Sequence, residues 1–276
     1  MCKLLWIILA FWGTLIQAQN DEYISVYPAF TTSQQIYLFG DQVHLRSEPK
    51  SDSKSLTVLE IGSPLIILED NNQNYSKDEP FWVHVRYNDK AGYIRSDFLS
   101  LQTVELNGVP LYTQLENNED KTTLKIRIPT QSIPAYYEKT FEVFSTMMQL
   151  EVFGSKGLKN VRNILHINYF AEACGIDGGG KYIFIDASGH WHDAFSYVQV
   201  SDAGIFYWQE TLTFPSEHKN GDYILYKSEY METVYEGDNY GDPIQTEEHK
   251  SERVLKWNGS EITPKFKQEP MPVNGW

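Results

Sequence analysis

Residues 82–99 read WVHVRYNDKAGYIRSDFL, and this stretch decides the fold that we expect for the first part of the chain. Two runs rich in Val, Tyr and Ile flank residues 88–92, a polar segment of the kind that turns a chain. Similar short runs precede it at residues 56–59 and 65–68, with a turn at Gly62-Ser63-Pro64 between them. Strands this short and closely spaced cannot form a large open sheet, so we expect them to curl into a small barrel.

Alternation along these runs predicts the core of the barrel, because successive side chains of a strand point to opposite faces. Gly62 and Gly92 are expected in turns, where a residue without a side chain is most permissive. The predicted core residues are Leu45, Val58, Ile66, Leu68, Val83, Val85 and Ile94.

Four ordered segments of this region resemble the bacterial SH3 family (SH3b, or SH3 type 3). Residues 43–49, VHLRSEP, resemble its opening V-N-L-R-S-x-P segment, with His in place of the usual Asn. Residues 59–65 follow where the family has its second strand and a Gly turn, and residues 82–87 and 92–99 resemble its closing W-x-x-V and G-Y-V-x-x-x-Y-L segments. The resemblance spans about residues 36–100. It implies a binding module, often seen in exported proteins that contact cell-wall peptides, and no chemistry by itself.

Side chains beside the longest loop of this barrel are its candidate ligand-binding residues. That loop, residues 70–80, is polar throughout, and long loops on rigid barrels often carry recognition, although a solvated insertion without a role is the alternative. Aromatic faces supply contact area at low entropic cost, and Arg offers a planar donor to a peptide carboxylate. The alternatives are structural: Trp82 as an anchor of the barrel core or rim, and Arg46 paired with a local carboxylate. The candidates are Arg46, Tyr75, Trp82, Tyr87 and Tyr93.

The first 19 residues are expected to be a secretory signal peptide. Lys3 precedes an apolar run over residues 4–16, and Gln17-Ala18-Gln19 offers a small residue near a cleavage point. The run is shorter than the roughly 20 apolar residues that span a membrane, so we expect no stable membrane insertion after cleavage; an uncleaved anchor or a buried first helix is the alternative. We therefore expect a protein secreted across the inner membrane, periplasmic or at the cell surface. Residues 20–35 form a lead-in that we expect to pair with the first barrel strand.

The formal net charge of −14 bears on the partners. Phosphate binding rests on clustered Lys and Arg, so nucleic acid is not an expected partner. An anionic membrane surface is disfavoured for the same reason. Together with the resemblance, this leaves a peptide or peptidoglycan-type ligand, or an envelope protein.

The length of 276 residues favours two domains, and residues 101–276 are expected to form the second. Residues 135–153 are the one stretch with helical character, and from Asn163 onward strands and turns alternate as a meander, with a turn at residues 177–180. We therefore expect a mainly β protein. The predicted architecture is a small SH3-like barrel followed by a larger antiparallel β-rich domain, a sandwich or a meander, with at most one helix.

Cys174 raises the possibility of catalysis, because cysteine peptidases often follow modules of this family. Such an enzyme needs a thiolate at a helix start and a nearby His. Cys174 instead follows a predicted strand, the Asp-Cys-Ser-Gly nucleophile motif is missing, and His190 and His192 lie only one hairpin further on. We expect no catalytic residues and a buried structural thiol. Two alternatives stay open: a cell-wall hydrolase that uses Cys174 with His190 or His192, and a structural subunit of an envelope complex.

Neither a metal nor a cofactor is expected. His190 and His192 share a strand face and could form a zinc site with His166 or Cys174, but two His without a definite third ligand are more often surface residues. Residues 177–180 lack the Lys-Ser/Thr ending of a phosphate loop. Aromatic residues of the second domain are expected in its core and edges, with a carbohydrate platform as the alternative: Tyr207, Trp208, Tyr223, Tyr226, Tyr230, Tyr235 and Trp257.

Overall fold

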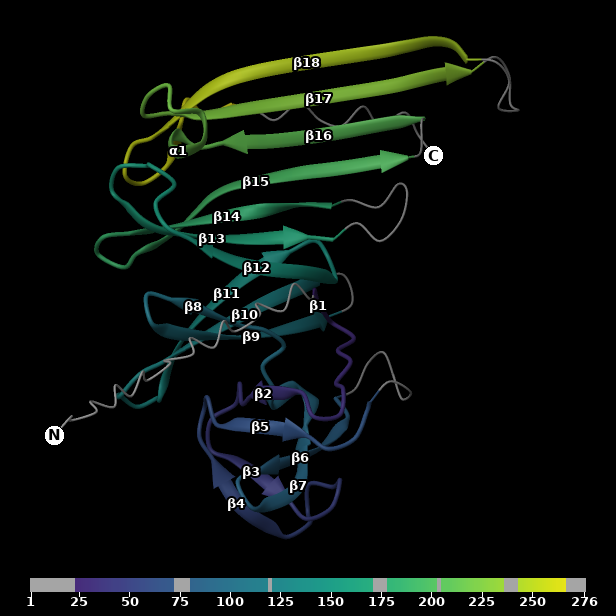
Figure 1. Cartoon of the computed structure of the whole chain (residues 1–276), viewed down its shortest axis with the longest axis vertical. Helices are drawn as coiled ribbons and strands as arrows, with labels where there is room; N and C mark the ends of the chain where they lie inside the picture. The colour runs from purple at the N-terminus through teal and green to yellow at the C-terminus, as the bar shows by residue number, and fades with distance from the viewer. Residues whose placement is uncertain are drawn as a thin grey trace, which may run out of the picture.

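The structure, a computed structural model, is built almost entirely of antiparallel strands (Figure 1). The mainly β prediction is confirmed. The predicted signal peptide, Tyr75 and Cys174 lie outside the described residues. The structure describes residues 23–71, 80–118, 121–170, 178–202, 205–235 and 243–266.

The predicted barrel is a six-stranded sheet with the strand order β2-β5-β6-β7-β3-β4. Its end strands, β2 and β4, are not hydrogen-bonded to each other, so the sheet curls without closing. A 3-10 turn, Ser96–Phe98, follows the last strand. The strands are β2 (Gln35–Tyr37), β3 (Val43–Arg46), β4 (Ser55–Leu59), β5 (Pro64–Ile67), β6 (Trp82–Tyr87) and β7 (Lys90–Arg95).

The core of the barrel follows the predicted alternation in three strands and contradicts it in β4 and β5. Leu45, Val83, Val85 and Ile94 are buried as expected. Val58 is instead 45% exposed, and Ile66 and Leu68 are only partly buried. Because strand side chains alternate with period two, a register error of one residue exchanges the inner and the outer face. The residues that fill the core in their place are Leu59, Leu65 and Ile67.

Gly92 lies inside β7 and not in the turn where it was expected. A Cβ atom on Gly92 would come within 2.5 Å of the Arg46 carbonyl oxygen and 3.0 Å of the Leu45 side chain. Glycine is therefore needed for the close approach of β3 to β7. Gly62, by contrast, has a φ of 78° and is a turn residue as predicted.

A four-stranded sheet with the order β11-β10-β9-β8 follows the barrel in the chain. A larger sheet of nine strands runs β1-β12-β13-β14-β15-β16-β17-β18-β19, so from β12 onward each strand pairs with the next. This confirms the meander. The strands are β8 (Thr103–Leu106), β9 (Val109–Asn118), β10 (Lys121–Pro129), β11 (Tyr136–Val143), β1 (Ile24–Ser25), β12 (Met147–Phe153), β13 (Val161–Tyr169), β14 (Gly178–Asp186), β15 (Trp191–Asp202), β16 (Phe206–Thr213), β17 (Ile224–Tyr235), β18 (Pro243–Trp257) and β19 (Ile262–Thr263).

The helix suggested for residues 135–153 is wrong, because β11 and β12 occupy this stretch. Glu, Lys, Met and Leu favour helices, but such propensities are weak and yield to tertiary packing. Here Met148 and Leu150 alternate with partly exposed residues and are fully buried between the sheets. The one helix among the described residues is the single turn α1 (Pro215–His218).

The lead-in pairs with the large sheet and not, as expected, with the first barrel strand. Ile24 lies opposite Met148 in β12, and its side chain is buried in the same cluster. Phe30 then enters the core of the barrel. In the chain, the barrel is thus preceded by a strand of the nine-stranded sheet and followed by β8 of the four-stranded sheet.

The four-stranded and the nine-stranded sheet pack face to face over part of their area. Leu111 and Leu124 of the four-stranded sheet share one buried cluster with Leu165 and Ile183 of the nine-stranded sheet. A second buried cluster surrounds Phe184 in the nine-stranded sheet. It includes side chains from β17 and β18 of the same sheet and that of the residue preceding α1. The domain is therefore a meander that forms a sandwich where the smaller sheet covers it.

The glycines at residues 178–180 begin β14 and do not form the predicted turn. A Cβ atom on Gly180 would lie 2.5 Å from the Ile167 carbonyl oxygen and 2.9 Å from the ring and hydroxyl of Tyr197. The Tyr197 ring occupies this space because its hydroxyl reaches Nε2 of His166 at 2.8 Å. Glycine here makes room for a buried tyrosine.

Arg127 joins the four-stranded sheet to the barrel. Its guanidinium lies over the rings of Phe39 (4.2 Å) and Tyr136 (4.0 Å). The same group donates to the Phe39 carbonyl oxygen at 3.0 Å and to Glu138 at 2.7 Å. Nearby, the buried Gln114 amide donates to the carbonyl oxygens of Ser96 and Leu99. The barrel is therefore held in one orientation on the sheet.

Gly180→Ala should destabilise the fold, because the added methyl group meets backbone and a buried ring. We expect a loss of about 1–3 kcal/mol in the free energy of unfolding, measured by denaturant titration. Gly154→Ala is the matched control, since a Cβ atom there has no neighbour within 4 Å. Equal stability of the two variants would contradict the account of Gly180.

Arg127→Ala should cost about 2 kcal/mol of stability, because it removes two ring contacts and leaves the Phe39 carbonyl oxygen without its donor. Arg127→Lys should recover only part of this, since an ammonium group lacks the planar fork. Arg162→Ala, which removes an exposed Arg from β13, serves as the control. A loss no larger than that of the control would refute the role of Arg127.

Candidate functional site

The outer face of the barrel collects side chains from β3, β6 and β7. In β6, Val83 and Val85 point into the core, so Trp82, His84 and Arg86 point outward. The strand register places Trp82 opposite Arg95, His84 opposite Tyr93, and Tyr93 opposite Arg46. We call Arg46, Trp82, His84, Arg86, Tyr93 and Arg95 the outer-face cluster.

Tyr93 is the centre of this cluster. The His84 ring stacks on it with the ring centres 4.6 Å apart and the planes within 12°. His84 Nδ1 donates to the carboxylate of Glu69 at 2.8 Å, which fixes the imidazole against Tyr93. On the other side, Arg46 donates from Nη1 to the Ser53 carbonyl oxygen at 2.7 Å. Arg46 is thus oriented by backbone and not by the local carboxylate that was the alternative.

The three arginines of the cluster differ in how far they are already paired. Arg95 makes a two-point contact with Asp97, at 3.0 and 2.7 Å. Arg46 uses one of its five N–H donors on Ser53. Arg86 is exposed and has no ion pair or side-chain hydrogen bond among the described residues. Half of the six arginines in the chain lie on this one face, although the chain as a whole is strongly acidic.

Of the five predicted ligand-binding residues, the structure brings three together. Arg46, Trp82 and Tyr93 belong to the outer-face cluster. Tyr87 does not, because its odd position in β6 points it to the inner side, where it packs against the barrel core. Tyr75 lies outside the described residues. The predicted ligand-binding residues did not include His84 and Arg86, although both alternate with buried valines in the same strand.

The base of the long loop is tied to the lead-in. The carboxylate of Asp70 accepts hydrogen bonds from the backbone N–H and the hydroxyl of Thr32, both at 2.6 Å. These bonds lower the pKa of Asp70. The Asn71 N–H donates to the Phe30 carbonyl oxygen at 3.0 Å. The loop therefore leaves the barrel from a fixed point.

His190, in the turn after β14, and His192, in β15, are both hydrogen-bonded to the carboxylate of Asp186 at the end of β14. Asp186 accepts from His192 Nε2 at 3.1 Å, from His190 Nδ1 at 3.3 Å, and from the backbone N–H groups of Ser188 and His190. These bonds, that of His192 first, lower the pKa of Asp186 to about 2. Asp186 thus shapes the turn and holds both imidazoles.

The two candidate bases of the hydrolase alternative lie next to each other after β14. His190 is in the turn that follows this strand, and His192 is in β15. The candidate thiol, Cys174, lies outside the described residues.

A buried polar chain in the large sheet was not foreseen from the sequence. His166 donates from Nδ1 to Glu151 at 2.9 Å, and its Nε2 accepts the Tyr197 hydroxyl at 2.8 Å. The Tyr182 ring stacks on His166 at 4.4 Å. The bond from His166 lowers the pKa of Glu151, and burial raises that of Tyr182 to about 12. The two hydrogen bonds join β12, β13 and β15, and the stacked ring adds β14, so the chain helps to specify the packing of these strands.

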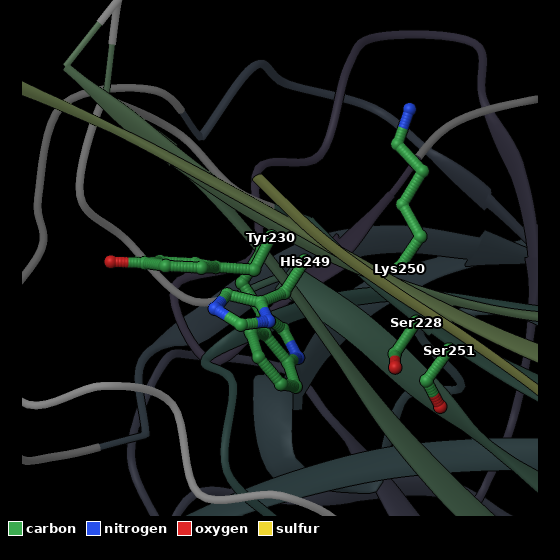
Figure 2. A pocket seen from close by; sticks show the side chains of 6 residues that line it. Ser228, Tyr230, His249, Lys250 and Ser251 are labelled. Carbon is green, nitrogen blue, oxygen red and sulfur yellow. The ribbon is translucent and has the colours of Figure 1, made fainter. Parts of the chain in front are cut away.

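Of the aromatic residues of the second domain that were considered as a carbohydrate platform, Trp208, Tyr226 and Tyr230 are buried, and Tyr207, Tyr223 and Trp257 are partly buried. Trp208, Tyr230 and His249 lie opposite one another on β16, β17 and β18. With Ser228 and Ser251 they line a cavity of about 90 Å³, and Figure 2 shows the Lys250 side chain pointing away from it. Trp208 and Tyr230 are more than 90% buried, so they offer no open face to a sugar.

Comparison with known families assigns the barrel. The model of the bacterial SH3 domain matches residues 41–100, which include β3 to β7. These residues form a bacterial SH3 domain, as the resemblance predicted, and they make up well under half of the chain. Bacterial SH3 domains are binding modules, often found in proteins associated with the cell wall. Comparisons with curated proteins and with solved structures found no similar protein.

The described residues also bear on metal binding and on membrane insertion. Within the described ranges, no three His, Cys, Asp or Glu side chains gather closely enough to hold a metal ion. In the same ranges, no helix is long and apolar enough to cross a membrane.

Asp186→Asn should make the stability of the fold depend less on pH under acidic conditions. A carboxylate with a lowered pKa stabilises the fold above its ordinary pKa of 3.8, and this contribution is lost as the pH falls towards about 2. We therefore expect the denaturation midpoint of the variant to fall less between pH 4 and pH 2 than that of the wild type. Asp89→Asn, in an exposed turn, is the control and should keep the wild-type slope. An unchanged slope in Asp186→Asn would rule out this role.

Proposed function

We propose that this chain is an exported, non-catalytic binding protein whose bacterial SH3 domain binds a peptide or cell-wall component through the outer-face cluster. The observation that carries the proposal is the convergence of Trp82, Tyr93, Arg46 and Arg86 on one face of β3, β6 and β7. The second domain acts as its scaffold or as a second binding face.

The chemistry of the cluster favours a ligand that carries a carboxylate. Among the described residues, no side-chain hydrogen bond or ion pair occupies the N–H donors of Arg86, and Arg46 uses only one of its five. A guanidinium and a carboxylate form two parallel hydrogen bonds. Trp82 and the Tyr93–His84 stack supply flat, preorganised surface beside them. Stem peptides of peptidoglycan combine free carboxylates with short apolar side chains, which matches this pairing.

The non-catalytic part of the proposal is supported by the sequence around Cys174, which lacks the Asp-Cys-Ser-Gly nucleophile motif. The hydrolase alternative would use His190 or His192 as the base, and both are hydrogen-bonded to Asp186. A structural subunit of an envelope complex is the other alternative, and it would use the same face for a protein partner. The proposed location is the periplasm or the cell surface, on the basis of the first 19 residues.

A sedimentation assay with purified peptidoglycan tests this proposal. The wild-type chain should be retained, and Trp82→Ala, Tyr93→Ala and Arg86→Ala should each weaken binding at least about tenfold, as expected for residues at the centre of a binding face. Two matched controls should bind as the wild type does. Tyr137→Ala removes an aromatic side chain that is 50% exposed on β11, and Arg162→Ala removes an exposed cation on β13.

Two results would count against the proposal. If the folded wild type is not retained, the cell-wall part fails. If it is retained but the three outer-face variants bind as well as the controls do, another surface holds the ligand. Circular dichroism of each variant separates loss of binding from loss of fold.

A further inference from the structure

A groove of about 590 Å³ lies where the four-stranded sheet meets the nine-stranded sheet. Asn117, Thr122 and Phe144 line it from the ends of β9, β10 and β11, and Tyr169 and Lys181 line it from β13 and β14. Its volume is within the range of roughly 300–1,000 Å³ that is typical of small-ligand sites. The groove lies in the second domain and shares no residue with the outer-face cluster.

Phe144 gives the groove an exposed aromatic surface. Its ring contacts that of Tyr169, with the ring centres 4.1 Å apart and the planes tilted by 58°. Tyr169 is almost fully buried, whereas Phe144 remains 50% exposed. A single exposed aromatic side chain is common on protein surfaces, but this one lines a groove of the size of a ligand site. The buried tyrosine therefore holds a phenyl ring in place at the groove.

The charges in the groove are paired. Lys121 lies 3.1 Å from Glu142, and Lys181 lies 2.7 Å from Asp193. Each of these cations already faces a carboxylate, so the described lining offers an anionic ligand no uncompensated positive charge. A ligand without net charge can instead bond to both members, since ammonium groups donate and carboxylates accept.

Uncharged polar groups complete the lining. Asn117 accepts a weak hydrogen bond from the Thr122 hydroxyl at 3.3 Å, and the Thr146 side chain is exposed. Amide and hydroxyl groups both donate and accept. Sugar hydroxyls do the same, and the C–H face of a pyranose ring packs against an aromatic ring.

We infer that this groove binds an uncharged oligosaccharide, with a sugar ring on Phe144 and its hydroxyls on the paired charges and on Asn117 and Thr146. The inference rests on the proposed function in one respect: it gives the second binding face a place and a ligand class. It does not depend on what the barrel binds.

Isothermal titration of the full chain with neutral tetrasaccharides of N-acetylglucosamine, glucose and mannose tests the inference. At least one should bind saturably, and tetragalacturonate, an anionic tetrasaccharide, should bind at least tenfold more weakly. Phe144→Ala should weaken binding of the neutral sugar at least tenfold. Thr146→Trp should abolish it, because an indole placed at this exposed position fills the groove without removing a core contact.

Tyr137→Ala is the matched control, since Tyr137 is equally exposed but lies outside the groove. The inference fails if no neutral tetrasaccharide binds, if tetragalacturonate binds as tightly as the neutral sugars, or if Phe144→Ala and Thr146→Trp bind as Tyr137→Ala does. Failure of this titration with intact, outer-face-dependent retention on peptidoglycan would remove the groove and leave the proposed function standing. The reverse result would remove the barrel as the binding site and leave the groove.

Discussion

The position of the small barrel on the larger β domain depends on Arg127. Its guanidinium lies between a barrel ring, Phe39, and a ring of the four-stranded sheet, Tyr136, and it is bonded to groups on both sides. Gln114 adds two hydrogen bonds from the same sheet to the end of the barrel. The lead-in closes the arrangement, since it is paired with β12 before the barrel begins. The barrel is consequently not a module on a free linker, and its outer face has one orientation.

A fixed orientation would matter for the two binding faces that we propose. Two sites on one rigid body can engage a polymeric ligand together only where their spacing matches that of the ligand. A bacterial cell wall carries peptides on glycan strands. A peptide-binding barrel and a sugar-binding groove on one rigid support would bind both of these components. In this view the sandwich formed by the four-stranded and nine-stranded sheets is the rigid support. The chain of Glu151, His166 and Tyr197 keeps the strands of the nine-stranded sheet in register.

How well a feature of the fold could be predicted from the sequence depended on how far apart in the chain its contacting residues lie. The bacterial SH3 segments and the meander are local patterns, and they were found. The helix suggested for residues 135–153 was wrong because composition does not reveal which strand will pair with a segment. The predicted core positions of β4 and β5 were off by one residue, since nothing in the sequence of a short strand between turns shows which of its residues face inward. Of the site residues, Arg46, Trp82 and Tyr93 meet, but Tyr87 points inward and His84 and Arg86 were overlooked.

By itself, the sequence determined the strand content, the bacterial SH3 domain and the order of the meander, because each arises from neighbours in the chain. Only the tertiary structure decided that β1 joins β12, that Gly92 and Gly180 serve close approaches of distant residues, and that Arg127 joins two sheets. It also decided the groove beside Phe144, whose walls come from strands on both sheets. The reason is physical: these features are contacts between segments far apart in the chain, and local propensity carries no information about them.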